Sequence, residues 1–234
     1  MLVRNFMTKK VITIEADDSM QKAIDIIKKH RINMMPVVEY GRLVGVISDS
    51  DLKRASASDA TDLAIHELKY LLNKIKVRDI MTPKVISVPP DFTIEETAEV
   101  LLQHDISGAP VIDHRGELVG IITRDDLFKA LISLSGLAKR GIQFGFQLED
   151  RPGSIKEVTD LIRLAGGRIA SILSYSDRVR EGWRNVFIRA YDLPRDNLPE
   201  LIKSLQEKAC MLYMVDHREN IRQIFDAPPV SYSV

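Results

Sequence analysis

The 234-residue sequence repeats itself, and this internal repeat limits the folds open to the chain more than any other feature. The octet GVISDSDL over 45–52 returns as GIITRDDL over 120–127, 75 positions later. Upstream of the octets, segments such as 36–38 (PVV) and 110–112 (PVI) match at a spacing of 74. Self-similarity over a unit of about 50 residues predicts two copies of one supersecondary element that pack together.

Each copy is predicted to contain a strand, a helix, two further strands and a second helix. The β-branched residues over 11–14 predict the first strand of copy one, and 85–88 predict its counterpart in copy two. Residues 36–38 and 43–47 predict a hairpin that turns at Tyr40-Gly41. The second helix is expected directly after each octet, where an acidic residue follows the strand.

The first helix of each copy is predicted to begin at a capping box. Asp18 with Gln21, and Thr93 with Glu96, have the spacing of this motif, in which a side chain accepts a backbone N–H at the helix start. Apolar residues at helical spacing follow both starts, so one face of each helix is expected to be buried.

The two repeats are expected over 1–54 and 77–135, with an insertion over 55–76. The insertion begins with ASASDATD, which predicts a loop in which Asp59 or Thr61 caps a helix. Its second half carries apolar residues at helical spacing. The sequence leaves two interpretations open, a packing helix that joins the repeats or a face for dimer or partner contacts.

A different pattern follows residues 136–141 (GLAKRG), which are a predicted domain boundary. The elements predicted over 142–216 have the order β-α-β-β-α-β of a ferredoxin-like unit. The remainder, 217–234, is predicted to be a poorly ordered tail. The whole chain is therefore expected to be an α+β protein of the α/β sandwich type, with paired repeats and a smaller second domain.

Composition excludes several classes of function. Lys plus Arg and Asp plus Glu both number 33, and a general nucleic-acid binder usually carries a basic excess. The single cysteine, Cys210, rules out an internal disulfide and a multi-thiolate metal site, and the scattered histidines have no metal-ligand spacing. No apolar run suggests a signal peptide or a membrane span. We expect a soluble cytoplasmic protein that binds neither nucleic acid nor membrane.

Each octet brings a hydroxyl and a carboxylate to the predicted N-terminus of a helix, Ser48 with Asp51 and Thr123 with Asp126. A helix N-terminus attracts phosphate, and a carboxylate accepts hydrogen bonds from a ribose diol. The same spacing is also close to that of a capping box, and a cap can face a ligand at the same time. The duplication favours two related nucleotide sites.

These features carry a family resemblance. The first 135 residues resemble a tandem pair of cystathionine-β-synthase-type (CBS) domains, on the strength of the two Met-Thr starts, the two Pro-Val pairs and the two octets. Residues 142–215 are similar to an ACT domain, with Asp150-Arg151-Pro152-Gly153 after a strand and Gly166-Gly167 after a helix. A CBS pair followed by one ACT domain resembles the acetoin-utilisation B protein family.

The resemblance implies that adenosine compounds bind in the cleft between the repeats. The Asp of each octet would hold the ribose hydroxyls and the Ser or Thr the phosphate, while backbone near the Pro-Val pairs would border the adenine. The matching positions are Thr13, Met35, Pro36, Val37, Ser48, Asp51, Ser87, Ala109, Pro110, Val111, Thr123, Arg124 and Asp126. Basic residues near enough in sequence to meet phosphates are Lys9, Lys10, Arg54, Lys84 and Arg124.

The ACT resemblance implies a second kind of site. In ACT domains the loop after the first strand often helps to bind an amino acid at a subunit interface. The residues in that position are Asp150, Pro152, Gly153 and Ser154. The ACT pattern commonly has Asn after the glycine that ends the first helix, whereas Arg168 follows Gly167 in this chain. An ACT unit used only for self-association is therefore an open alternative.

The function expected from this reasoning is regulation without catalysis. The sequence has no Ser-His-Asp ordering and no Walker-type lysine loop, so we expect no enzyme, no required cofactor and no metal. AMP, ADP or ATP would be the regulatory ligand of a homodimer that acts on a metabolic enzyme partner, by resemblance in acetoin or acetate metabolism. A ligand-free dimerisation scaffold is one alternative, and an S-adenosylmethionine binder is another.

The two octets differ at the residue after the hydroxyl, which is Asp49 in copy one and Arg124 in copy two. Arginine favours phosphate and aspartate repels it. If one site alone takes a polyphosphate, we expect it to be the site of Thr123 and Asp126. The cationic S-adenosylmethionine would suit the more acidic first site.

Overall fold

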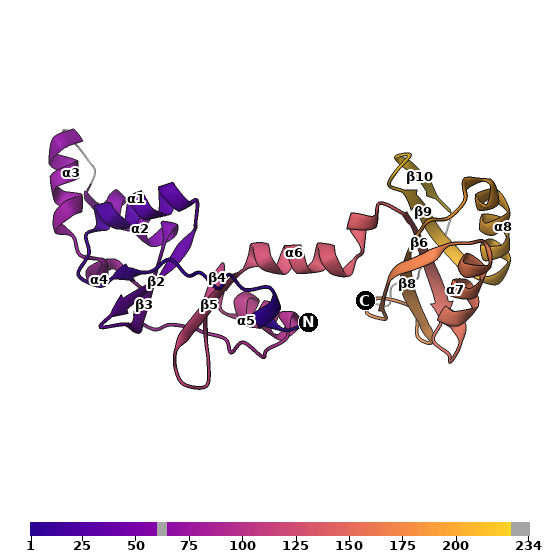
Figure 1. Cartoon of the computed structure of the whole chain (residues 1–234), viewed down its shortest axis with the longest axis horizontal. Coiled ribbons are helices and arrows are strands. Elements are labelled where there is room, and N and C mark those ends of the chain that lie inside the picture. Colours follow the sequence, from indigo (N-terminus) through magenta and orange to yellow (C-terminus); the bar gives the residue numbers. More distant parts are fainter. Residues whose placement is uncertain (60–64, 226–234) are drawn as a thin grey trace. The chain divides into compact units, whose positions relative to one another are not determined.

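The computed structural model describes residues 1–59 and 65–225. The chain divides into two compact units, Met1–Ala130 and Leu131–Val234, each of which mixes helices with strands (Figure 1). The predicted mixture of α and β elements is therefore confirmed. Within the described ranges, no helix combines the length and the apolar character that crossing a lipid bilayer requires.

The first repeat contains, in chain order, β1 (Ile14–Glu15), α1 (Met20–His30), β2 (Met34–Glu39), β3 (Arg42–Ser48) and α2 (Asp49–Asp59). β1 pairs in parallel with β2, and β2 and β3 form the predicted antiparallel hairpin. Its turn residues Tyr40 and Gly41 both have positive φ, 50° and 75°, as the right-handed twist of a two-residue hairpin requires.

The second repeat contains α5 (Ile94–Gln103), β4 (Gly108–Ile112), β5 (Leu118–Thr123) and α6 (Arg124–Leu134). β4 and β5 form an antiparallel two-stranded sheet. The predicted strand over 85–88 is wrong, because the structure has one isolated parallel bridge there, from Val88 to Val111. Pro89 and Pro90 follow at once, and proline cannot donate to a strand ladder. In the first repeat the strand lies at Ile14–Glu15 rather than 11–14.

The two predicted capping boxes have different outcomes. The box of Thr93 and Glu96 is confirmed: Thr93 Oγ1 accepts the Glu96 N–H at 3.2 Å, and the Glu96 carboxylate accepts the Thr93 N–H at 2.7 Å. The prediction of Asp18 with Gln21 is wrong, because Ser19 caps α1 by accepting a backbone N–H at 3.2 Å. The Asp18 carboxylate instead accepts the backbone N–H of Glu15, the last residue of β1, at 3.1 Å.

The insertion is more helical than the sequence predicts. α2 continues through 55–59, where we expected a loop, so Asp59 lies at the end of a helix. Alanine is the strongest helix former and recurs in this stretch, which accounts for the extension. A second helix, α3 (Ile65–Lys74), follows. Thr61 lies outside the described residues.

The start of each repeat packs on the core of the other repeat. The short helices η1 (Val3–Asn5) and α4 (Val77–Ile80) open the two repeats. Val3 is 0% exposed and belongs to the core of the second repeat, with Val88 and Leu101, whereas Val77 is 0% exposed in the core of the first. The repeats therefore interlock, and neither completes its core alone.

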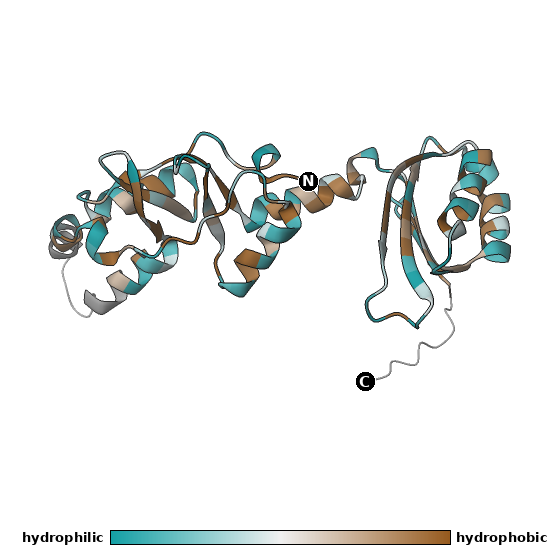
Figure 2. Ribbon diagram, turned by 90° about the horizontal axis from the view of Figure 1, so that it is seen from below, coloured by the Kyte–Doolittle hydropathy of each residue, from teal (hydrophilic) through white to brown (hydrophobic). Residues whose placement is uncertain are grey.

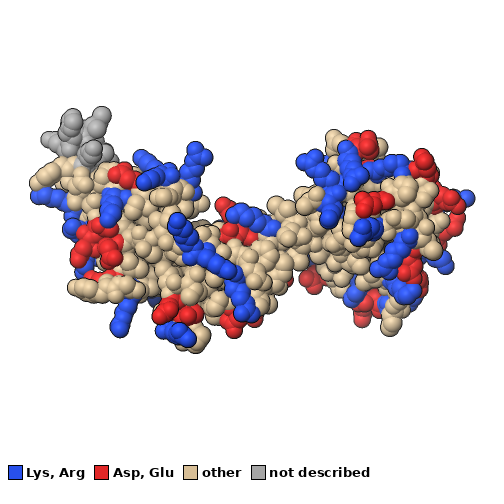
Figure 3. Space-filling view, in the orientation of Figure 1, with Lys and Arg blue, Asp and Glu red and all other residues tan. Residues whose placement is uncertain are grey.

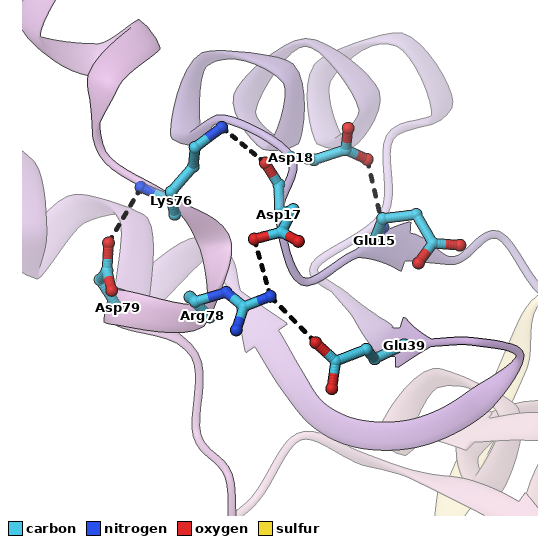
Figure 4. A network of polar contacts seen from close by, with 7 residues as sticks. All are labelled: Glu15, Asp17, Asp18, Glu39, Lys76, Arg78 and Asp79. Carbon is cyan, nitrogen blue, oxygen red and sulfur yellow. Dashed lines mark hydrogen bonds and ion pairs between the residues drawn. The ribbon is translucent and has the colours of Figure 1, made fainter.

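A polar network holds the start of the second repeat against the first (Figure 4). Arg78 pairs with Asp17 at 2.7 Å and with Glu39 at 2.9 Å, which raises the pKa of its guanidinium, Asp17 having the larger effect. The Lys76 ammonium donates to the carbonyl oxygen of Asp17 at 2.8 Å. These contacts fix the segment that leads from α4 toward the candidate site described below.

The second unit is built on one antiparallel sheet in the order β10-β9-β6-β8-β7. Its elements are η2 (Leu137–Lys139), β6 (Ile142–Glu149), α7 (Ser154–Leu164), β7 (Arg168–Tyr175), β8 (Trp183–Tyr191), η3 (Arg195–Asn197), α8 (Leu198–Lys208), β9 (Cys210–Asp216) and β10 (Ile221–Ile224). The strands and α-helices over 142–216 have the predicted order. β10 pairs with β9, which corrects the expectation of a poorly ordered segment there.

One face of this sheet is covered by α7 and α8 (Figure 1). Alternate residues of β6 are buried, and Phe144 and Phe146, both 0% exposed, belong to one core cluster with Ile162 of α7 and Leu205 of α8. Figure 2 shows the resulting pattern, with apolar and polar residues alternating around both helices. The period-2 pattern in the strands and the period-3.6 pattern in the helices therefore meet in one core.

Candidate functional site

The first candidate site lies where β3 ends and α2 begins. The Ser48 hydroxyl donates to Asp51 Oδ2 at 2.6 Å, and the Ser48 N–H donates to the same oxygen at 2.9 Å. Ser48 Oγ also accepts the Asp51 N–H at 3.2 Å. Asp51 is only 7% exposed, and Arg54 pairs with its other oxygen. The capping interpretation of this octet is therefore confirmed, and the contacts hold the carboxylate in one orientation.

The second candidate site repeats this geometry where β5 ends and α6 begins. The Thr123 hydroxyl donates to Asp126 Oδ2 at 2.8 Å, and the Thr123 N–H donates to it at 3.0 Å. Asp126 is also 7% exposed, and Lys129 lies 3.0 Å from its Oδ1. Both octets thus present a buried carboxylate whose second oxygen, Oδ1, is paired with a cation.

A cavity of about 580 Å³ lies beside Ser48 and Asp51 and is lined by both repeats. The first repeat contributes the end of β3 and the start of α2. The second repeat contributes the segment after α4 and the entry to β4, namely Thr82, Lys84, Ile86, Asp105, Ile106, Ser107, Gly108 and Pro110. Its volume falls within the range of about 300–1,000 Å³ typical of small-molecule sites.

A second cavity, of about 410 Å³, lies beside Thr123 and Asp126. Here the second repeat contributes the octet and the first turns of α6. The first repeat contributes its opening segment and the entry to β2, namely Thr8, Lys10, Ile12, Arg31, Ile32, Asn33 and Met34. Most of these residues stand 74 positions before their counterparts in the first cavity, so the two cavities are related by the repeat.

The two cavities share a wall. Asn33, Met34 and Ser107 line both of them. A Cβ at Gly108 would lie 2.8 Å from the Ile122 carbonyl oxygen and 2.9 Å from the Met34 sulfur, so only glycine fits this close approach without displacement. The interlocked starts of the repeats place the cavities side by side in Met1–Ala130.

The described linings differ in charge. The first cavity has equal numbers of acidic and basic residues, Asp49, Asp51, Asp105, Arg54, Lys84 and Arg124. The second has an excess of basic residues, with Asp125 and Asp126 against Lys10, Arg31, Arg124 and Lys129. On the face seen in Figure 3, basic and acidic side chains both occur on each unit.

Comparison with known proteins places the chain in a family. The CBS domain model matches residues 3–58 and 77–133. The uncharacterized protein MJ1426 of Methanocaldococcus jannaschii is 35% identical over 156 residues, which cover 56% of this chain and 92% of that protein. The CBS domain-containing protein DDB_G0289609 of Dictyostelium discoideum is 31% identical over 134 residues, which cover 57% of this chain and 92% of that protein. The chain belongs to the CBS-domain family.

A solved CBS pair is also similar to this one. The crystal structure of the CBS domain pair of protein MJ0100, in complex with 5′-methylthioadenosine and S-adenosyl-L-methionine, has 32% sequence identity and a TM-score of 0.48. The similarity covers 56% of this chain and 95% of that one. The two matches of the CBS domain model, one in each repeat, confirm the predicted tandem CBS pair for the first part of the chain.

The predicted ligand residues of the CBS pair fall into two groups. Those at the cavities are Ser48, Asp51, Pro110, Thr123, Arg124 and Asp126. Those absent from the described linings are Thr13, Met35, Pro36, Val37, Ser87, Ala109 and Val111. The side chains of Met35, Val37, Ala109 and Val111 are 0% exposed and belong to the hydrophobic cores. Ile12 and Ile86, one position before Thr13 and Ser87, line the cavities.

Sequence reasoning missed several residues that line the cavities, among them Arg31, Asn33, Ser107 and Lys129. Asn33 and Ser107 precede the second strand at matching positions of the two repeats. Their carbonyl oxygens accept the N–H of Asp49 and of Arg124, each at 2.9 Å. A closer reading of the 74-residue spacing at this point would have found them. Of the basic candidates, Lys9 is not among the described lining residues.

The predicted loop of the second unit is held by polar contacts. The Asp150 carboxylate lies 3.0 Å from Arg184 Nε, and Gly153 has the positive φ of 90° at the start of α7. Ser154 is 6% exposed and borders a cavity of about 190 Å³. Asp150, Pro152 and Gly153 are not among the described residues that line this cavity.

No group of three or more His, Cys, Asp or Glu side chains in the described ranges could hold a metal ion. Cys210 is half-buried, and burial raises the pKa of its thiol, which disfavours the reactive thiolate. The described linings of the two larger cavities offer hydroxyls, carboxylates and basic side chains for hydrogen bonds and ion pairs.

Proposed function

We propose that this chain is a non-catalytic regulator whose CBS pair binds adenine nucleotides in the two cavities. The observation that carries the proposal is the duplicated Ser/Thr–Asp cap, which borders a cavity in both repeats. A carboxylate can accept about four hydrogen bonds, and the cap occupies two of these on Oδ2. The second oxygen, Oδ1, is the natural partner for ribose hydroxyls.

The cations on the Oδ1 atoms do not prevent this binding. The side chains of Arg54 and Lys129 are 75% and 73% exposed. Each cation thus stays in contact with water, and hydroxyl groups can donate to the carboxylate in its place. Ribose hydroxyls can therefore replace these contacts, and the released cations remain close enough in sequence to meet the phosphates. The helix N-termini of α2 and α6 favour a phosphate by their dipoles.

The two cavities are proposed to differ in preference. AMP, ADP or ATP suits the second cavity, where basic residues outnumber acidic ones. The first cavity carries Asp49 and Asp105 in addition to Asp51, so S-adenosylmethionine, a cation, is a second candidate ligand there. Both candidates share the adenosine part, whose ribose diol would donate hydrogen bonds to the aspartate of either octet.

The second unit is proposed to be an ACT-type domain over 142–216. Its element order and the positive φ of Gly153 support this assignment. In the proposal, ligand binding in the CBS pair changes the affinity of a homodimer for a metabolic enzyme, in acetoin or acetate metabolism by family resemblance. A ligand can do this only if it binds two states of the protein with different affinity. A ligand-free dimerisation scaffold is the alternative.

Thermal unfolding of the full chain with AMP, ADP, ATP and S-adenosylmethionine tests the proposal. A ligand at a hundredfold excess over Kd stabilises by about 2.7 kcal/mol, which raises Tm by a few degrees. Asp51→Ala and Asp126→Ala are expected to reduce the shift. Asp25→Ala, on the exposed face of α1, is the matched control. A shift that is undiminished in both cavity variants, or no shift with any ligand, contradicts the proposal and favours the scaffold.

A further inference from the structure

Arg124 lines both cavities, although the repeat assigns it to one of them. By octet spacing its counterpart is Asp49, and among the described lining residues Asp49 belongs to the first cavity alone. Arg124 is the only ionisable residue among those linings that occurs in both. It stands with Asn33, Met34 and Ser107 at the wall between the cavities, and this position breaks the symmetry of the repeats.

The side chain of Arg124 is held loosely, whereas its backbone is fixed. Its Nη2 lies 3.2 Å from Asp105 Oδ1, and the Asp105 side chain is 99% exposed. Such an exposed pair contributes little, so a phosphate can take the place of Asp105. The backbone N–H of Arg124 donates to the Ser107 carbonyl oxygen at 2.9 Å and anchors the start of α6. A change of this side chain therefore leaves the helix start intact.

We propose that Arg124 binds phosphate in both cavities, so that one guanidinium serves two nucleotides. This inference rests on the proposed function. A guanidinium has five N–H donors in a rigid planar fork, so its different edges can face two phosphates. Because the matching position of the first repeat is Asp49, the described linings contain no second arginine in this role. In this proposal Arg124, which belongs to the octet of the second repeat, supplies a phosphate contact to the first cavity.

Isothermal titration calorimetry of the full chain with AMP and with ATP tests this inference. The wild type is expected to bind two nucleotides. Arg124→Gln is expected to weaken both binding steps about tenfold, since a hydrogen bond to a charged group is lost at each. The loss should be larger for ATP than for AMP. Arg54→Gln and Lys129→Gln, which alter the first and the second cavity respectively, are matched controls that should each weaken one step.

The possible results separate this inference from the proposed function. Weakening of a single step by Arg124→Gln, or one nucleotide per wild-type chain, overturns the shared role and leaves nucleotide binding established. No nucleotide binding by the folded wild type overturns the proposed function itself. Arg124→Lys keeps the charge without the fork and is expected to lose less affinity than Arg124→Gln at both steps. No loss at either step in these two variants, with folding verified by circular dichroism, also overturns the shared role.

Discussion

The two CBS repeats have matching residues in their cores but differ in the charge of their cavities. Ile47 and Ile122 occupy matching positions on β3 and β5, and both are 0% exposed. By contrast, the residue after the hydroxyl of the octet is Asp49 in the first repeat and Arg124 in the second, so these matching positions carry opposite charges. A close-packed core tolerates little change in shape, whereas a solvated cavity wall tolerates a change of charge. Similar repeats can therefore form sites with different ligands.

The largest expected effect is the loss of stability when one of these matching core residues is truncated. Ile47→Ala and Ile122→Ala should each destabilise the protein by about 3 kcal/mol, because truncation of a fully buried isoleucine leaves a cavity. Urea unfolding followed by circular dichroism measures the change. Leu102→Ala is the control, since Leu102 is 75% exposed and should lie within about 0.5 kcal/mol of wild type. A loss at only one of the two isoleucines would show that the repeats are not equivalent in packing.

The difference between the cavities can be removed by one substitution. Asp49→Arg gives the first octet the charge of the second and should raise ATP affinity of the first cavity about tenfold, the effect of one charge-assisted hydrogen bond. Titration calorimetry on the Asp126→Ala background isolates that cavity. Asp25→Arg makes the same charge change on the exposed face of α1 and should leave ATP affinity close to its value in that background. No gain at Asp49 would mean that its side chain does not meet the phosphates.

A smaller effect is expected from the caps of α2 and α6, which should differ in how much they stabilise the protein. Ser48 Oγ accepts the Asp51 N–H at 3.2 Å, and the hydrogen bonds found among the described residues include no such contact to Thr123 Oγ1. Ser48→Ala should therefore cost about 1 kcal/mol, and Thr123→Val, which keeps the side-chain volume, should cost less. Chemical denaturation of both variants gives the comparison. A larger loss for Thr123→Val would contradict the difference in capping seen in the structure.

Much of the first unit could be predicted because the repeat reports the same structure twice. The hairpin, the box of Thr93 and Glu96 and the octet caps all follow from local side-chain chemistry. The interlocking of the repeats could not, because Val3 and Val77 are ordinary valines whose burial depends on the partner repeat. For the same reason the sequence could not show that each cavity combines an octet with the opening segment of the other repeat.

The second unit shows the same limit in a polar residue. Arg189 lies on β8 and is only 3% exposed, although arginine is rarely buried without a partner. Its Nε donates to the Ser135 carbonyl oxygen at 2.7 Å and its Nη2 to Gln143 Oε1 at 3.0 Å. Burial lowers the pKa of this guanidinium. The partners are 54 and 46 positions away, so no local pattern indicates them.

The smallest expected effect compares the starts of α5 and α1, which are capped with and without an acidic partner. Hydrogen bonds from the Thr93 backbone N–H, and then from its hydroxyl, lower the pKa of Glu96 below its ordinary value of 4.5. Between the lowered pKa of the folded chain and the ordinary pKa of the unfolded chain, the unfolded chain therefore binds more protons. The stabilisation by ionised Glu96 is complete above the ordinary pKa and is lost as the pH falls through the lowered pKa. Ser19, the cap of α1, has no such titration.

Glu96→Gln should accordingly lower Tm slightly at pH 7, and its difference from wild type should shrink as the pH falls below 4.5. Thermal unfolding between pH 7 and pH 3 measures this, with Glu99→Gln on the same helix as the control for loss of charge. A difference that stays constant over this range would mean that the Glu96 carboxylate does not stabilise α5 through its ionised form. Because α1 and α5 are matching helices of the two repeats, such a result would reduce the distinction between the two caps to their hydroxyl contacts alone.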